Sequence, residues 1–152
     1  MFSPKENRIL QDLKKEEELC IEKYTKYENS AASPQLKSLM RQIRSQEQSH
    51  LDTLTKILNG EAPPPSGGGN GQQTGPQAQA ADYAGDTNGY NNDKYLCTDA
   101  LGTEKHVSAM YDTSIFAMQS VAVRDALNHI QKEEQEHGEK LSSYMMQNGM
   151  QD

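Results

Sequence analysis

Two short stretches of the sequence carry the same pair of side chains at the same spacing. Each places a His three residues after a Glu: Glu47 and His50 in QEQSH, and Glu134 and His137 in EEQEH. Residues three apart on a helix lie on one face, so each pair would present a carboxylate and an imidazole together. Both groups bind divalent metal ions such as iron and manganese. The two stretches therefore raise the question of a shared metal site.

The two stretches belong to a longer internal repeat. Adding 87 to the numbers of Glu17, Tyr24, Glu47 and His50 gives Glu104, Tyr111, Glu134 and His137. The same offset relates Ser33 to Ser120 and Ile43 to Ile130. We interpret this repeat as the duplication of one helical hairpin.

Each half of the chain has apolar residues at the spacing of two amphipathic helices. The first half predicts helices over about 4–31 and 34–58, and the second predicts helices over about 93–118 and 121–147. Short connections join the helices of each half, so each pair is expected to lie antiparallel. The expected fold class is therefore all-α, a four-helix bundle in which two hairpins form one domain. The expected inward positions of the four helices are Leu10, Leu13, Cys20, Tyr24, Tyr27 and Ala31; Leu36, Met40, Ile43, Leu54 and Ile57; Cys97, Leu101, Val107, Tyr111, Ile115 and Met118; and Val123, Leu127, Ile130, Leu141 and Tyr144.

Residues 61–92 separate hairpin one (1–60) from hairpin two (93–152). They are rich in Pro, Gly, Gln and Asn and have few side chains to bury, which predicts a flexible linker. Asn92 or Asp93 is expected to cap the third helix. A coil of about 30 residues averages roughly 30 Å end to end, so the linker can cross the length of the bundle. The sequence does not decide whether it does.

The inward face of every predicted helix turns acidic at one height. Glu17 and Glu104 interrupt the first and third helices, and the two Glu-x-x-His pairs interrupt the second and fourth. The hairpin turns fall near 32–33 and 119–120. Because antiparallel helices rise equally per residue, the three polar residues of each hairpin should reach the same level. All six side chains are thus expected to converge in the middle of the bundle.

Four carboxylates in an apolar core would repel each other and lose their hydration, and two divalent cations would offset this cost. A Glu from each of two helices, with Glu-x-x-His from each of the other two, is the ligand pattern of di-iron and di-manganese bundles. We therefore expect Glu47 and Glu134 to bridge two Fe or Mn ions. Glu17 and Glu104 would be terminal ligands, and His50 and His137 would each bind one ion. The sequence assigns no catalytic residue.

For several nearby residues the sequence gives less support for a role in the metal site. Tyr24 and Tyr111 are either core aromatics or hydrogen-bond donors to the glutamates one or two turns away. Cys20 is interpreted as a small buried apolar residue rather than a ligand. The residues expected on solvated surfaces are Glu16, Glu18, Glu22, His106, His129, Glu133, Glu136 and Glu139.

The composition excludes several classes of protein. The net charge of −7 and the lack of a basic stripe argue against a nucleic-acid binder. No apolar run has the length of a signal peptide or of a membrane span, which needs roughly 20 residues. The two cysteines form no CxxC pair and no disulfide framework. The expected location is a reducing cytoplasm.

At the six polar positions the chain resembles the ferritin-like superfamily, in particular the short rubrerythrin-like diiron domains. This resemblance covers both hairpins and implies the same six ligands: Glu17, Glu47, His50, Glu104, Glu134 and His137. Two departures limit it. The chain has no four-cysteine rubredoxin site, and Val107 stands where rubrerythrins tend to have an additional Glu. A rubrerythrin-type peroxidase activity is therefore not implied.

Residues 92–149 are similar to the spore coat F domain of endospore-forming Firmicutes. The segments that carry this likeness are KHVSAMY, RDALNHIQKEEQEH and the closing YMMQNG, without the aromatic pair often found after that Gly. The resemblance implies a protein made in the mother cell and deposited in the spore coat. It implies no activity, because the family is named for a location.

Two functions follow from these features. The first is a dimetal protein that handles O2, peroxide or Fe(II) by ferroxidase, peroxidase or catalase-like chemistry. The alternative is a structural spore coat component whose metal site only stabilises the fold or is unused. The expected partners are metal ions, O2 or peroxide and other coat proteins, with neither nucleic acid nor membrane. A homodimer is one assembly that such bundles form.

Overall fold

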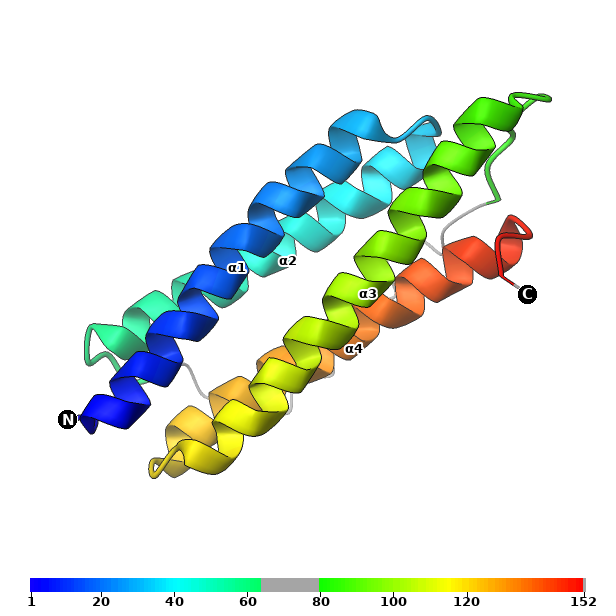
Figure 1. Ribbon diagram of the computed structural model, residues 1–152. Coiled ribbons are helices and arrows are strands. Elements are labelled where there is room, and N and C mark those ends of the chain that lie inside the picture. The colour runs from blue at the N-terminus through cyan, green and yellow to red at the C-terminus, as the bar shows by residue number, and fades with distance from the viewer. Residues whose placement is uncertain (64–79, 152) are drawn as a thin grey trace.

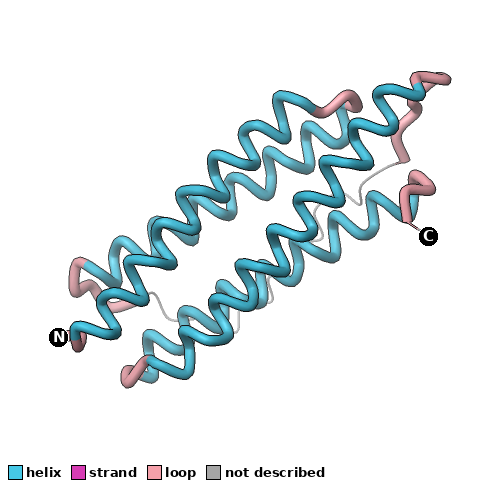
Figure 2. Tube along the Cα trace, in the orientation of Figure 1, coloured by secondary structure: helices cyan, strands magenta, loops and turns pink. Residues whose placement is uncertain are grey.

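The computed structural model describes residues 1–63 and 80–151, and this part of the chain contains four helices and no strand. The helices are α1 (Pro4–Ser30), α2 (Pro34–Leu58), α3 (Thr87–Ala117) and α4 (Val121–Gln147), as Figures 1 and 2 show. The predicted all-α class and four-helix arrangement are therefore confirmed. Residues 64–79 of the predicted linker lie outside the described residues.

The four helices pair as two hairpins. α1 packs along α2 and α3 along α4, while smaller contacts of α1 with α3 and of α2 with α4 join the hairpins. α2 ends and α3 begins at opposite ends of the bundle (Figure 1). The positions of these two helix ends require a crossover topology, which the sequence allowed but did not decide. None of the described helices is long and apolar enough to span a membrane.

Serine residues begin three of the four helices. Ser3 accepts a hydrogen bond from Glu6 N and forms a capping box with the Glu6 side chain. Ser33 accepts from Leu36 N at 2.9 Å, and Ser120 accepts from Val123 N at 3.3 Å. Each bond satisfies an N–H group that has no partner within the helix. These caps explain why α1, α2 and α4 begin where the sequence predicts.

The predicted start of the third helix at residue 93 is wrong. α3 begins at Thr87, and its N-cap is Asp86, which accepts a hydrogen bond from Gly89 N at 2.9 Å. Neither Asn92 nor Asp93 is the cap. Asp93 is instead fully buried one and a half turns into the helix, where it accepts hydrogen bonds from backbone N–H groups of the α1–α2 loop. The composition of this Asn- and Gly-rich stretch predicts a linker. The Asp86 cap and the tertiary contacts of Asp93 stabilise it as helix instead.

The inward face of α3 also differs from the prediction. Leu101 and Ile115 are only partly buried, while Ala100, Thr103 and Ser114 face the core. The prediction took the largest apolar residue of each turn as inward. In this helix several of the inward places are filled by small side chains, so the larger residues lie at the edge of the core.

Two apolar clusters fill the two ends of the bundle. The cluster near the α1–α2 loop includes Tyr24, Leu36, Met40, Ile43, Cys97, Leu141 and Tyr144. The cluster near the α3–α4 loop includes Leu10, Leu13, Cys20, Leu54, Val107, Tyr111, Leu127 and Ile130. Each buried Leu or Ile contributes roughly 1.5–3 kcal/mol of hydrophobic free energy. The polar residues of the site lie between these clusters and are therefore held by packed apolar layers on both sides.

Candidate metal centre

The structure brings all six predicted ligand residues together in the middle of the bundle. α1 contributes Glu17, α2 contributes Glu47 and His50, α3 contributes Glu104, and α4 contributes Glu134 and His137. None of the six is more than 3% exposed. They lie at one level because each hairpin folds back at its predicted turn.

The six residues form two overlapping groups. One consists of Glu17, Glu47, His50 and Glu134, and the other consists of Glu47, Glu104, Glu134 and His137. Within each group, one ligand atom from every residue lies within 4.8 Å of the others. Glu47 and Glu134 belong to both groups. This is the arrangement expected of two metal positions that share two bridging carboxylates, and the binding itself stays a prediction.

Each histidine reaches across the bundle to the glutamate of the opposite Glu-x-x-His pair. His50 Nδ1 lies 2.9 Å from Glu134 Oε1, and His137 Nδ1 lies 2.9 Å from Glu47 Oε1. The two rings are stacked with their centroids 5.9 Å apart. Both Nδ1 atoms therefore face the carboxylates.

Two buried tyrosines bind the remaining glutamates, and each does so across the two hairpins. Tyr111 O–H donates to Glu17 Oε1 at 2.5 Å, and Tyr24 O–H donates to Glu104 Oε1. Both rings are completely buried. The sequence left open whether these tyrosines are core aromatics or donors, and the structure shows that they are both.

The contacts between the hairpins are reciprocal. Tyr24 of the first hairpin binds Glu104, which is the equivalent of Glu17 in the second hairpin. Tyr111, the equivalent of Tyr24, binds Glu17 of the first hairpin. The two histidine–glutamate contacts are related in the same way. Such exchange of equivalent contacts is the mark of two-fold symmetry. The duplicated hairpins thus meet like the two subunits of a symmetric dimer.

The outer face of each imidazole has a partner that the sequence analysis missed. His137 Nε2 donates to Gln46 Oε1 at 2.7 Å, and His50 Nε2 lies 3.4 Å from Glu133 Oε1. Glu133 was expected on a solvated surface but is only partly exposed. An oxygen acceptor at Nε2 keeps that nitrogen protonated and leaves Nδ1 as the ligand atom. Both partners precede a ligand Glu by one residue and are related by the offset of 87, which could have identified them.

Several buried polar atoms of the site have no hydrogen-bond partner among the described residues. They are Glu17 Oε2, Glu47 Oε1 and Oε2, Glu104 Oε2, Glu134 Oε2 and His137 Nδ1. Although Glu47 Oε1 and His137 Nδ1 lie 2.9 Å apart, they are not aligned for a hydrogen bond. A buried polar atom without a partner costs about 1–3 kcal/mol, so these atoms need another ligand. Four carboxylates and two imidazoles are a donor set that fits two divalent cations.

Burial and mutual repulsion change the protonation of the site. Burial, followed by the hydrogen bond to Glu134, raises the pKa of Glu104 to about 9. Burial also raises the pKa of Glu17, and the neighbouring Glu47 adds to this. Burial alone would lower the pKa values of His50 and His137, but the hydrogen bonds that they donate to the surrounding carboxylates outweigh it and raise them. Without metal the site therefore holds protons at neutral pH, and binding of cations would displace them.

The pKa of Glu134 shifts in the opposite direction to the pKa values of Glu17 and Glu104. Burial would raise its pKa, but hydrogen bonds from Glu104, His137 and His50 outweigh burial and lower it well below the ordinary value. Glu134, one of the two glutamates common to both groups, thus keeps its negative charge. A charged Glu134 is consistent with its place between the two predicted metal positions.

Cys20, Val107 and the two remaining histidines lie where the sequence predicts. Cys20 is fully buried in the cluster near the α3–α4 loop and belongs to neither ligand group. Burial raises the pKa of its thiol. Val107, at the place of an additional Glu in rubrerythrins, is also fully buried. The side chains of His106 and His129 are 66% and 54% exposed.

Comparison with curated proteins and with solved structures gave no match. Residues 92–151 match the family model of the Coat F domain. This range contains most of α3 and all of α4, and therefore Glu104, Glu134 and His137. The second hairpin is thus similar in sequence to the Coat F domain.

Proposed function

We propose that this chain is a ferritin-like dimetal protein associated with the spore coat. The observation that carries the proposal is the pair of four-residue groups that share Glu47 and Glu134. Glu47 and Glu134 would bridge two Fe or Mn ions, and Glu17 and Glu104 would be terminal ligands. His50 and His137 would each bind one ion through Nδ1.

The charge balance of the buried site supports this proposal. Four buried glutamates would carry four negative charges when ionised, and two divalent cations would neutralise them. Without such cations the site must hold protons on groups that ordinarily ionise below neutral pH, as the raised pKa values of Glu17 and Glu104 indicate. Isolated buried charges cost several kcal/mol each. A site of this kind is therefore expensive unless it binds metal.

Bound as a pair, iron or manganese supplies redox chemistry toward O2, peroxide or Fe(II), of the ferroxidase, peroxidase or catalase-like kind. The protein's own residues position the ligands and exclude water. The Tyr24 and Tyr111 hydroxyls each hold one oxygen of a terminal carboxylate and leave the other without a protein partner. Gln46 and Glu133 orient the imidazoles. The two apolar clusters keep bulk water away from the site on both sides.

The Coat F domain match supports a place in the spore coat. Mother-cell synthesis, deposition on the spore and contact with other coat proteins are parts of the proposal. The domain name also favours the second candidate, a structural coat component in which metal only stabilises the bundle. The two candidates differ in whether the bound metal turns over O2 or peroxide.

Elemental analysis of the full chain, purified without a histidine tag, tests the dimetal proposal. We expect about two Fe or Mn ions per chain, as the bundle ligand pattern implies, and their loss in the His50→Ala/His137→Ala variant. Absence of metal, together with no uptake of Fe(II) or Mn(II) on reconstitution, would overturn it. Metal without turnover of O2 or peroxide would favour the structural candidate. A Glu47→Ala variant would then lose thermal stability without losing any activity.

A further inference from the structure

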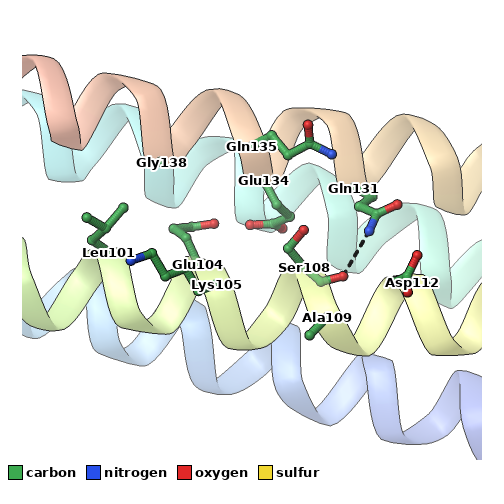
Figure 3. A pocket seen from close by; sticks show the side chains of 10 residues that line it. All are labelled: Leu101, Glu104, Lys105, Ser108, Ala109, Asp112, Gln131, Glu134, Gln135 and Gly138. Atoms are coloured by element: carbon green, nitrogen blue, oxygen red, sulfur yellow. Dashed lines mark hydrogen bonds between the residues drawn. The ribbon is translucent and has the colours of Figure 1, made fainter.

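A groove of about 480 Å³ lies between α3 and α4 directly over the candidate metal centre (Figure 3). Two of its lining residues, Glu104 and Glu134, are predicted ligands. Ser108, Asp112, Gln131 and Gly138 also line it. The groove therefore joins the outer face of the second hairpin to the site.

Two of the predicted ligands meet at the groove. Figure 3 shows the Glu104 and Glu134 carboxylates pointing toward one another between the two helices. Oε2 of each is buried and has no hydrogen-bond partner among the described residues. These are buried, unpaired oxygens on residues that line the groove.

The groove exists because small side chains stand on its walls. Gly138 lies inside α4, where Gly costs about 1 kcal/mol relative to Ala. Close packing does not require it, because a Cβ atom there would meet only Leu101 Cδ1, at an ordinary contact distance of 3.6 Å. The Gly thus lowers helix stability without relieving a clash. Its structural consequence is to leave the groove unfilled.

The first hairpin has larger side chains at the two corresponding positions. By the offset of 87, Leu51 stands where Gly138 stands, and Ile21 stands where Ser108 stands. Both larger side chains are partly buried. The repeats therefore keep the same ligands but differ in the bulk of the residues over them.

The lining of the groove favours cations. Glu104, Glu134 and Asp112 offer carboxylates, against the single ammonium group of Lys105. Gln131 is held in place because its Nε2 donates to the Ser108 carbonyl oxygen at 3.0 Å. Its amide oxygen then remains as a neutral acceptor. Oxygen ligands of this kind suit divalent cations such as Mn(II) and Fe(II).

We propose that the α3–α4 groove is the route by which divalent cations enter and leave the metal centre. This inference rests on the proposed function. A cation passes from Asp112 at the wall to the Glu104 and Glu134 oxygens. In the first hairpin Leu51 and Ile21 stand at the positions of Gly138 and Ser108, so we expect any equivalent route there to be narrower.

Filling the groove with the residues of the first hairpin tests this route. The variants are Gly138→Leu and Ser108→Ile in the full chain, with Co(II) as the probe because its visible absorbance reports binding. We expect both variants to slow Co(II) uptake, and its release to a chelator, by about tenfold or more. The affinity at equilibrium stays within about twofold, because the six ligands are unchanged and a barrier alters both rates equally.

Gly102→Leu is the matched control. Gly102 lies within α3, as Gly138 lies within α4, and a Cβ atom at Gly102 meets nothing within 4 Å. This variant is expected to take up Co(II) at the parent rate. If Gly138→Leu loses its helical circular dichroism, Ser108→Ile and Gly138→Ala carry the test, with partial slowing expected from the Ala variant.

The outcomes separate this inference from the proposed function. A parent chain that binds no Co(II), Fe(II) or Mn(II) at all would overturn both. A parent chain that binds metal, with filled-groove variants that load at the parent rate, would overturn the route alone. Slow loading with unchanged affinity would support it.

Discussion

The two hairpins of this chain carry the same functional residues in different surroundings. Each supplies two glutamates, one histidine and one tyrosine at positions related by an offset of 87. The neighbouring positions have diverged: Cys20 corresponds to Val107, and Leu51 corresponds to Gly138. The polar positions are those that reach the centre of the bundle, where each must meet its counterpart from the other hairpin. Duplication thus built a site that neither hairpin contains alone.

The same reciprocity holds at the ends of the bundle, but with unequal strength. Glu6 of α1 accepts a hydrogen bond from Gln119 N of the α3–α4 loop at 3.2 Å. The equivalent Asp93 of α3 accepts from Ala32 N and Ser33 N of the α1–α2 loop at 2.7 and 2.9 Å. Each hairpin therefore stabilises the loop of the other through side-chain to backbone hydrogen bonds.

The largest expected difference is between shared and unshared glutamates. Because Glu47 belongs to both ligand groups, Glu47→Ala should remove both metal ions. Glu17 and Glu104 each belong to one group, so Glu17→Ala and Glu104→Ala should each leave one ion bound. Elemental analysis of the three purified variants checks this. Equal losses in all three variants would contradict the assignment of bridging and terminal roles.

The second comparison concerns the loop contacts. Asp93→Ala should lower the stability of the fold by about 2–4 kcal/mol, because it leaves the part-buried N–H group of Ala32 and the buried N–H group of Ser33 without this partner. At about 2–4 °C per kcal/mol for a chain of this size, Tm should fall by roughly 5–15 °C. Glu6→Ala should have a smaller effect, since Glu6 lies near the exposed start of α1.

Thermal unfolding followed by circular dichroism measures the difference between the two loop variants. Asp93→Asn, which keeps an oxygen acceptor, is the control and should recover part of the loss. A Glu6→Ala variant as unstable as Asp93→Ala would show that the two ends of the bundle contribute equally.

Asp93 also shows where the sequence is a poor guide to the fold. The repeat, the apolar spacing and the serine caps were sufficient to predict four helices and three of their starting points. The start of α3 was not predictable in the same way. Asp93 follows a Gly- and Asn-rich stretch, and an Asp in that place is as well suited to capping a helix as to lying inside one. Only the packed structure shows that Asp93 binds a loop from the other hairpin.

The next prediction concerns pH and the metal-free protein. The raised pKa of Glu104, about 9 against an ordinary value of 4.5, means that the folded state holds a proton that the unfolded state releases. The stabilisation from this proton is complete below pH 4.5 and is lost as pH rises to about 9. The raised pKa values of Glu17 and the two histidines act in the same direction.

Tm of the metal-free chain should therefore fall between pH 5 and pH 9, and a Glu104→Gln variant should show a weaker dependence. Saturating metal should remove most of the decline, because the cations take the place of the protons. Thermal scans with a chelator and with Mn(II) across this pH range test both statements. A metal-free Tm that rises with pH would show that the buried site is ionised without metal.

The six ligands were predictable because each interrupts an apolar helical face at a defined height. Their outer partners were not, because Gln46 and Glu133 lie beside the inward face rather than on it. A Glu in so acidic a chain is usually solvated, and the only signal for Glu133 is its position one residue before a ligand Glu, which Gln46 shares. Its contact with His50, at 3.4 Å, arises only from the packing of α2 against α4, whereas its contact with the exposed His129, at 2.9 Å, lies within α4.

The smallest expected effect comes from exchanging these outer partners. A carboxylate at Nε2 makes an imidazole a more basic ligand than an amide oxygen does, so the ion bound by His50 should be held more tightly than the ion bound by His137. Glu133→Gln should weaken the tighter site by about tenfold, the lower end of the range for outer partners. Gln46→Glu should strengthen the weaker one. The Glu133→Gln/Gln46→Glu double variant should restore two unequal sites with the order reversed. Competition with a chelator resolves the two binding constants, and equal constants in the parent chain would show that the outer partners do not distinguish the two halves.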